Sequence, residues 1–241
     1  MPQTLSIIIP CYNEESTILE LLRRVGKADI GEVRKQIIIV DDGSTDRTRA
    51  LLTELASERA ADSAVGHIVI LQPHNQGKGA AIRRGLEEVR GDVVIIQDAD
   101  LEYNPENYAS LIAPILAGRS RVVYGSRERN LNNRLHSGVA FYAGGKFLSA
   151  LTNLLYGSAI TDEPTCYKVF EAALIRDIPL TCTRFEFCPE VTAKVLRRGI
   201  AIEEIPIDYF PRKKHEGKKI NWRDGVEAIW TLFRYRFSNR V

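Results

Sequence analysis

Short apolar runs alternate with helical patterns through the first half of this sequence. The runs at residues 5–9, 37–40, 67–71, 92–97 and 121–124 are almost continuously apolar rather than alternating with polar residues. Continuous apolar strands are typical of a sheet that is covered on both faces, and strand–helix alternation favours parallel strands. The sequence therefore predicts an α/β fold with a mainly parallel sheet covered by helices.

The stretches between these runs carry apolar residues at helical spacing. Ile18, Leu21, Leu22 and Val25 share one helix face, which predicts a helix over residues 16–25. Asp46 is expected to cap a helix that runs to about residue 59, and further helices are expected over 78–89 and 105–116. A length of 241 residues suits one domain, residues 1–241.

The second half is less regular and leaves two interpretations open. Residues 202–207 are expected to form a strand, and residues 138–156 and 224–237 are expected to form amphipathic helices. The last helix groups Trp230 and Phe233 with arginines near its end. Both helices fit either docking on the sheet or resting in lipid headgroups at a membrane surface.

Charge and cysteine content exclude several classes of protein. The formal net charge is +2, so no nucleic-acid partner is expected. The four cysteines form no C-x-x-C pair, which argues against a zinc site. We find no leader pattern and no apolar run near the ~20 residues of a membrane span, so reduced thiols and a cytoplasmic location are expected.

Two carboxylates one residue apart follow the run at 92–97. In parallel sheets ligands bind beyond the carboxyl ends of the strands, so Asp98 and Asp100 should lie at the binding edge. Two unpaired carboxylates at one point cost several kcal/mol, which favours a cation between them. Oxygen ligands suit Mg²⁺ or Mn²⁺ carrying a diphosphate. The alternative is a pair that merely caps the next helix.

Other polar residues should reach the same edge. Tyr12 can stack on a base, and Glu14 can accept hydrogen bonds from a base or a ribose. Asp42 precedes Gly43, which permits a tight turn. Lys78 lies in Asn-Gln-Gly-Lys-Gly, which is neither a P-loop nor a dinucleotide fingerprint but could support a nucleotide.

These motifs, in this order and spacing, resemble the inverting glycosyltransferases of family 2. The resemblance rests on I-P-C-Y-N-E, V-D-D-G-S-T-D, N-Q-G-K-G, D-A-D and G-S-R, and continues through D-E-P-T-C-Y-K and F-E-F-C-P-E to Pro206 and Lys218. Within that family the chain is most similar to polyprenyl-phosphate glycosyltransferases of the dolichyl-phosphate mannose synthase type. Two positions depart from the pattern: Glu102 stands where Gln or Ser is frequent, and Cys166 where Ser is common.

The resemblance implies a GT-A (Rossmann-like) fold with amphipathic C-terminal helices, and a role for each matching residue. The nucleoside would be bound by Pro10, Tyr12, Glu14, Val40 and Asp42, the diphosphate by Asp98, Ala99 and Asp100, and the metal by Asp98, Asp100 and Glu102. Arg127 would face the sugar and the acceptor phosphate, and Arg212 and Lys218 would close over the donor phosphates. Asp100, Arg127 and Glu190 are the expected catalytic residues.

The expected reaction is inverting transfer of a sugar from a UDP- or GDP-sugar to a polyprenyl phosphate at the cytoplasmic face of the membrane. Residues 1–127 would bind the nucleotide sugar and residues 128–241 the acceptor. Glu190 and Asp162 are candidates for a general base or for residues that orient Arg127. The alternatives are a transferase with a hydroxyl acceptor and a non-catalytic binder. A separate membrane subunit and a homo-oligomer stay open.

Overall fold

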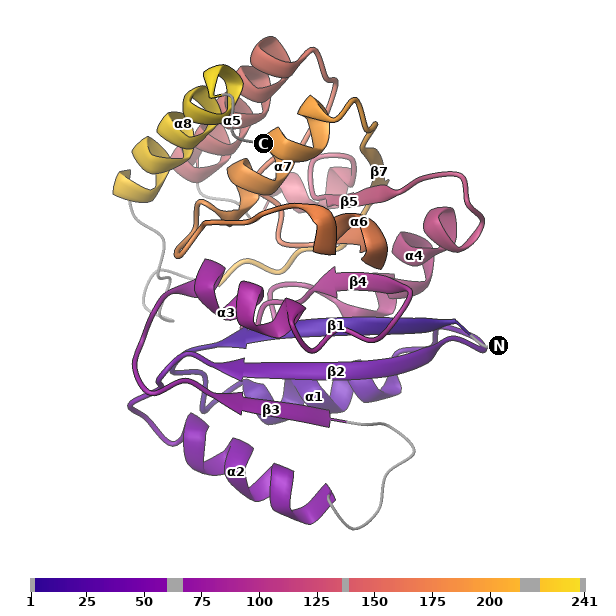
Figure 1. Cartoon of the computed structure of the whole chain (residues 1–241), viewed down its shortest axis with the longest axis vertical. Coiled ribbons are helices and arrows are strands. Elements are labelled where there is room, and N and C mark those ends of the chain that lie inside the picture. Colours follow the sequence, from indigo (N-terminus) through magenta and orange to yellow (C-terminus); the bar gives the residue numbers. More distant parts are fainter. Residues whose placement is uncertain (1–2, 60–66, 136–138, 213–221, 239–241) are drawn as a thin grey trace.

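A seven-stranded sheet forms the centre of the protein (Figure 1). The computed structural model describes residues 3–59, 67–135, 139–212 and 222–238. The strands lie in the order β3-β2-β1-β4-β6-β5-β7. Their bounds are β1 (Thr4–Cys11), β2 (Arg34–Asp41), β3 (His67–Leu71), β4 (Val93–Ile96), β5 (Val122–Ser126), β6 (Lys168–Glu171) and β7 (Glu203–Pro206). The mainly parallel, helix-covered sheet that the sequence predicts is confirmed.

Helices cover both faces of this sheet, with α1 behind it and α3 in front of it in Figure 1. The helices are α1 (Ile18–Lys27), α2 (Thr48–Arg59), α3 (Lys78–Leu86), α4 (Tyr108–Leu116), α5 (Val139–Tyr156), α6 (Ala172–Asp177), α7 (Phe187–Arg197) and α8 (Trp222–Phe237), with single 3₁₀ turns at η1 (Pro105–Asn107) and η2 (Leu131–Leu135). The face of α1 that the spacing predicts is buried. Asp46 accepts the Thr48 backbone N–H at 2.9 Å, as expected of a capping residue.

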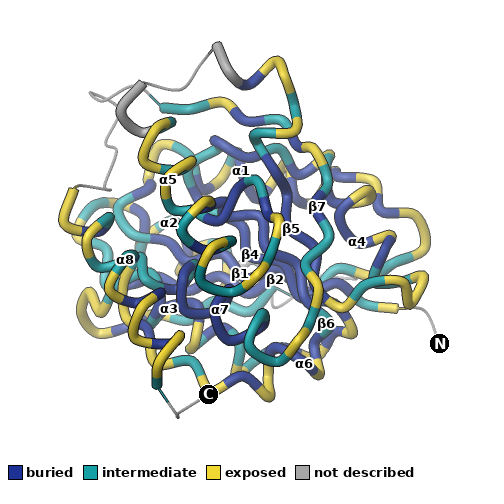
Figure 2. The backbone as a smooth tube through the Cα atoms, turned by 90° about the horizontal axis from the view of Figure 1, so that it is seen from above, coloured by how far each residue is buried: buried dark blue, intermediate teal, exposed yellow. Residues whose placement is uncertain are grey.

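The strands nearest the centre explain why the apolar runs are continuous. β1 and β2 are parallel and in register, with Ile7 opposite Ile37 and Ile9 opposite Ile39. All of these side chains are buried, and the tube view shows the strands as the dark interior of the molecule (Figure 2). A strand that packs against helices on both faces has no solvent side, so it carries no alternating polar residues.

One strand was missed from the sequence, and it changes the topology. β6 lies between β4 and β5 and is antiparallel to both. Its first residue, Lys168, is fully buried, with Nζ donating to the Glu163 carbonyl at 2.6 Å and lying 3.6 Å from the centre of the Tyr124 ring. A four-residue strand that begins with a lysine lacks the continuous apolar run that predicts a buried strand. The lysine is tolerated there because its ammonium has partners inside the protein.

The two C-terminal amphipathic helices lie side by side, with the Tyr156 hydroxyl of α5 donating to the Leu232 carbonyl of α8 at 2.6 Å (Figure 1). Helix α8 turns its aromatic residues outward: Trp222 is 75% exposed and Trp230 67% exposed. Asp224 and Thr231 lie on its buried face. Trp222 and Trp230 are therefore not part of the hydrophobic core. Among the described residues, no helix has the length and apolar character needed to cross a bilayer.

Candidate functional site

The predicted binding residues gather at the carboxyl ends of the parallel strands. β1 leads to Tyr12 and Glu14, and β2 ends at Asp41 beside Asp42. Pro10 pairs in register with Val40, and both are buried, so they form the floor of this edge. β4 leads to residues 98–102, where Ala99 is buried, and β5 leads to Arg127. The polar motifs meet because the strands that carry them are neighbours.

Asp42 fixes the start of helix α3. Its two carboxylate oxygens each accept a backbone N–H at 2.8 Å, one from Gln76 and one from Gly77. Burial raises the pKa of Asp42, and these two donors oppose that shift. Gly77 has φ +98°, and a Cβ there would lie 2.3 Å from the Thr183 carbonyl oxygen. Asp42 and a required glycine thus set the position of Lys78, the first residue of α3.

Lys78 reaches the first aspartate of the D-A-D motif. Its Nζ lies 2.5 Å from Oδ1 of Asp98. Burial by itself would lower the pKa of Lys78, but the charge and hydrogen bond of Asp98, together with Cys166 and Cys188, raise it. The lysine is therefore a permanent cation at this edge, and it neutralises Asp98.

Glu102 is held by the segment that follows β7. Its Oε2 accepts the Tyr209 hydroxyl at 2.6 Å, and its Oε1 accepts the Arg212 backbone N–H at 2.8 Å. Asp100 differs from Asp98: its Oδ1 accepts the Glu102 backbone N–H at 3.1 Å, and within the described part of the chain it forms no ion pair, whereas Asp98 pairs with Lys78. Burial and the charges of Asp98 and Glu102 raise the pKa of Asp100 to about 7.

These contacts bear on the predicted metal ligands Asp98, Asp100 and Glu102. In the part of the chain that the structure describes, no three or more His, Cys, Asp and Glu side chains are arranged as a metal site. Asp98 is paired with Lys78, and Glu102 accepts hydrogen bonds from the Tyr209 hydroxyl and the Arg212 backbone N–H. The roles of Asp98, Asp100 and Glu102 as metal ligands stay a prediction. The excess negative charge at Asp100 still fits a divalent cation.

Arg212 joins Glu14, at the predicted nucleoside end of the site, to the D-A-D motif. Its Nη2 lies 2.7 Å from Oε2 of Glu14, and its Nε donates to the Asp100 carbonyl at 2.7 Å. The predicted donor residues Glu14, Asp100 and Arg212 are thus brought together. Lys218 lies outside the described residues, so its predicted role stays a prediction.

Arg127 is held in a fixed orientation by Asp162. The Nε and Nη2 atoms of Arg127 donate to the two oxygens of Asp162 at 2.8 and 2.7 Å, and its backbone N–H donates to Oδ2 at 2.9 Å. Burial would lower the pKa of Arg127, but Asp162 raises it well above the usual value. Of the two roles predicted for Asp162, this contact supports orienting Arg127.

Glu190 has a different set of partners. Its Oε1 accepts hydrogen bonds from Lys194 Nζ at 2.6 Å and from the Tyr235 hydroxyl at 2.7 Å, and its Oε2 accepts the Cys182 N–H at 2.6 Å. Burial opposes ionisation, but the bonds from Lys194 and Tyr235 outweigh it and lower the pKa of Glu190 to about 2. The carboxylate connects α7 with α8, and its catalytic role stays a prediction.

One residue of the site was missed from the sequence. Tyr209 donates to Glu102, and the guanidinium carbon of Arg127 lies 5.0 Å from the centre of its ring. A tyrosine after a short strand gives no signal by itself, because aromatic residues are common in cores. Only the spatial neighbourhood of Glu102 and Arg127 reveals it.

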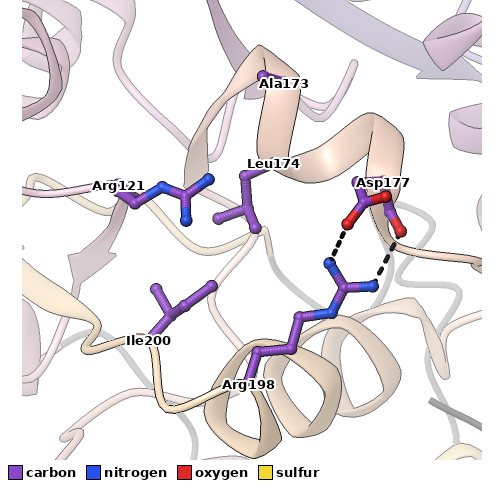
Figure 3. A pocket seen from close by; sticks show the side chains of 6 residues that line it. All are labelled: Arg121, Ala173, Leu174, Asp177, Arg198 and Ile200. Atoms are coloured by element: carbon purple, nitrogen blue, oxygen red, sulfur yellow. Dashed lines mark hydrogen bonds and ion pairs between the residues drawn. The ribbon is translucent and has the colours of Figure 1, made fainter.

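A pocket of about 400 Å³ lies away from this edge, at the amino end of β5 (Figure 3). It is lined by Arg121, Ala173, Leu174, Asp177, Arg198 and Ile200. Its charged groups are already paired: Arg198 donates to Asp177 at 2.6 Å, and Arg121 to Glu171 at 2.5 Å. None of the predicted site residues lines it.

Known proteins resemble this chain in sequence and in fold. Residues 6–178 match the family model described as "Glycosyl transferase family 2". The chain is 30% identical to the low-salt glycan biosynthesis hexosyltransferase Agl6 of Haloferax volcanii, over 98% of this chain and 54% of that protein. It is 32% identical to an undecaprenyl-phosphate 4-deoxy-4-formamido-L-arabinose transferase of Klebsiella pneumoniae, over 88% of this chain and 62% of that protein. The chain thus spans little more than half the length of these two relatives.

A third relative is matched along nearly its whole length. It is the UDP-N-acetylglucosamine–dolichyl-phosphate N-acetylglucosaminyltransferase of Methanococcus voltae, 30% identical over 96% of both chains. Among solved structures, glucosyl-3-phosphoglycerate synthase of Mycobacterium tuberculosis, crystallised with Mn²⁺, UDP and glucosyl-3-phosphoglycerate, superposes with a TM-score of 0.71 at 20% identity, over 97% of this chain and 80% of that chain. That likeness confirms the GT-A fold. By its family match and its full-length relative, the chain belongs to glycosyl transferase family 2.

Proposed function

We propose that this protein transfers a sugar, with inversion, from a UDP- or GDP-sugar to a polyprenyl phosphate. The observation that carries the proposal is the arrangement of Arg127, which Asp162 holds through Nε and Nη2. No described residue hydrogen-bonds Nη1, so this side of the guanidinium is available to a second anion. A planar, permanently charged guanidinium is suited to binding a phosphate through two hydrogen bonds.

The donor end supports the same reaction. Transfer from a nucleotide sugar passes through a cation-like anomeric carbon while a diphosphate leaves. A divalent ion such as Mg²⁺ or Mn²⁺, when bound, would neutralise that diphosphate. Asp100, with a pKa raised to about 7 by burial and by its acidic neighbours, is the carboxylate of this edge that most needs a cation. Arg212 adds positive charge within 2.7 Å of the Asp100 carbonyl.

The state of the two candidate bases favours a phosphate acceptor over a hydroxyl acceptor. A hydroxyl must lose a proton to a general base near the anomeric carbon. Asp162 is committed to Arg127 and Glu190 to Lys194, and the pKa of Glu190 is lowered to about 2, which makes it a weak base. A lipid phosphate is already an anion at pH 7 and needs no such base. The polyprenyl-phosphate transferases among the relatives support the same choice.

We further propose that residues 1–127 bind the donor and residues 128–241 the acceptor, with Arg212 and Lys218 reaching back to the donor phosphates. The outward face of α5 and α8 would rest on the cytoplasmic side of a membrane. Leu154 of α5 is 82% exposed and Trp230 of α8 is 67% exposed, and α8 also carries the exposed arginines Arg223, Arg234 and Arg236. Apolar and aromatic side chains among arginines match anionic headgroups over an acyl layer.

The test is incubation of the protein with labelled UDP- and GDP-sugars, undecaprenyl or dolichyl phosphate, and Mg²⁺ or Mn²⁺. We expect a lipid-linked sugar whose anomeric configuration is inverted, and loss of the product when a chelator is added. Glycosylation of hydroxyl acceptors alone would overturn the lipid acceptor. Binding of nucleotide sugars without transfer or hydrolysis would identify a non-catalytic binder instead.

A further inference from the structure

Tyr209 contacts both ends of the candidate site with different parts of one side chain. Its hydroxyl donates to Oε2 of Glu102 at 2.6 Å, and its ring lies under the guanidinium of Arg127 at 5.0 Å from the ring centre. The residue is almost fully buried, so neither contact competes with bulk water. We propose that Tyr209 is a positioning residue that fixes the donor-side carboxylate Glu102 and the acceptor-side cation Arg127 relative to each other.

The backbone around Tyr209 makes this position rigid. Tyr209 forms an antiparallel bridge with Tyr103, and the Phe210 N–H donates to the Glu102 carbonyl at 2.9 Å. Asn133 joins the same residues a second time: its Nδ2 donates to the Arg127 carbonyl at 3.0 Å, and its Oδ1 accepts the Tyr209 N–H at 3.1 Å. The backbone around Tyr209 is therefore linked by hydrogen bonds to the same two regions, around Glu102 and Arg127, that its side chain contacts.

This position matters for the chemistry because transfer joins two separately bound reactants. The inference rests on the proposed function, in which Glu102 belongs to the metal and diphosphate end and Arg127 to the acceptor phosphate. Misplacing bound reactants by about 1 Å can cost about 100-fold in rate. A side chain that contacts both ends holds their separation without touching either reactant.

The two contacts can be removed separately. Tyr209→Phe deletes the hydroxyl bond to Glu102 and keeps the ring under Arg127, whereas Tyr209→Leu deletes both. Tyr108→Phe is the matched control, because it removes a buried tyrosine hydroxyl that donates to Gln97 at 2.6 Å, with no bond to Glu102 or Arg127. Each variant is assayed by calorimetry of Mn²⁺ with UDP or GDP, whichever the wild type binds, by KM for polyprenyl phosphate, and by thermal unfolding.

We expect Tyr209→Phe to weaken binding of the Mn²⁺ nucleotide about 10-fold, the scale of a lost hydrogen bond to a charged group, with the acceptor KM within about 2-fold. Tyr209→Leu should show the same loss and raise the acceptor KM by about 3- to 10-fold, because the cation–π contact is also gone. Tyr108→Phe should change neither quantity.

Two results would overturn the positioning role while leaving the proposed function intact. One is a Tyr209→Phe protein with wild-type nucleotide binding and kcat. The other is an equal loss in every parameter for Tyr209→Phe, Tyr209→Leu and Tyr108→Phe that follows the fall in melting temperature. If the wild type itself binds no nucleotide with Mn²⁺ and forms no lipid-linked product, the proposed function fails instead.

Discussion

The Nη2 atom of Arg212 lies 2.7 Å from Oε2 of Glu14, although 198 positions separate the two residues in the chain. The Glu14 side chain is 7% exposed and that of Arg212 15% exposed, so the pair is shielded from water. The contact connects the end of the first strand to the segment after the last one. A nucleotide sugar that binds Glu14 and presents its phosphates to Arg212 must compete for both members of this pair.

A double-mutant cycle measures this pair. Glu14→Gln, Arg212→Gln and the double variant should give a coupling of about 1–3 kcal/mol in the free energy of unfolding, because each single change removes the opposite charge from a largely buried ion pair. The cycle is measured by urea unfolding with and without saturating nucleotide sugar and Mn²⁺. We expect the coupling to shrink when the donor is bound. An unchanged coupling would mean that Arg212 does not turn to the donor phosphates.

Asp100→Asn should lower turnover by at least ~100-fold, the scale of losing a major electrostatic stabiliser. Asparagine keeps the size of the side chain and can still accept the Glu102 N–H, so folding should be preserved. Initial rates of lipid-linked product formation, with thermal unfolding as the folding control, test this. Turnover like that of the wild type would remove Asp100 from the metal site.

Arg127→Lys should raise the KM for polyprenyl phosphate by about 10-fold or more, because an ammonium cannot replace two parallel N–H bonds. The KM for the nucleotide sugar should stay within about 2-fold of the wild-type value, because Arg127 bonds to Asp162 rather than to the donor residues. Steady-state kinetics with each substrate varied in turn separate the two effects. A rise confined to the donor KM would contradict the acceptor role.

Glu190→Gln should destabilise the protein at pH 7 by about 3 kcal/mol, because it leaves the buried ammonium of Lys194 without its counter-charge. The pKa of Glu190 is lowered from 4.5 to about 2 in the folded protein, so its ionised form stabilises the fold above pH 4.5 and this contribution is lost between pH 4.5 and 2. The variant should therefore lose less stability than the wild type across that range. Urea unfolding at several pH values tests this.

The matched control for Glu190 is Glu32→Gln, since Glu32 is exposed. It should follow the wild-type pH dependence. If Glu190→Gln instead keeps full stability and loses only turnover, the carboxylate is catalytic, as the sequence first suggested.

Replacing Trp222, Trp230 and Phe237 together by Ser should abolish flotation of the protein with vesicles that contain anionic phosphatidylglycerol. These side chains are 75%, 67% and 75% exposed, so their loss should leave the melting temperature nearly unchanged. Leu19→Ser, an exposed leucine on α1, is the control and should bind like the wild type. Vesicle binding that survives the triple change would place the membrane contact elsewhere. If the wild-type protein does not bind vesicles but forms dimers, the exposed aromatic residues of α8 contact a second copy of the chain instead of a membrane.

The first half of the fold follows closely from the sequence because its signals are local. Continuous apolar runs mark strands that are buried on both sides, and the spacing of Ile18, Leu21 and Val25 marks the buried face of α1. The topology rule for parallel sheets then brings Glu14, Asp42 and Asp100 to one edge. None of these inferences needs knowledge of contacts between distant segments.

The remaining features depend on long-range contacts, which a single sequence does not display. Strand β6 was missed because the buried Lys168 ammonium is stabilised by the Glu163 carbonyl and the Tyr124 ring, and neither contact can be read from the sequence. The engagement of Glu102 by Tyr209 and of Asp98 by Lys78 was missed for the same reason. Spacing alone therefore did not show which carboxylates of the predicted metal site already have partners in the folded protein.

Strand β6 also constrains how the chain can be made. β5 pairs with β6 and β7 and not directly with β4. When only the first 127 residues have left the ribosome, β5 therefore has no strand with which to pair. β5 can join the sheet only after about forty more residues have been synthesised, when β6 (residues 168–171) can pair with both β4 and β5. A truncation after Arg127 would leave one edge of β4 and both edges of β5 unpaired and prone to aggregation, rather than an autonomous nucleotide-binding module.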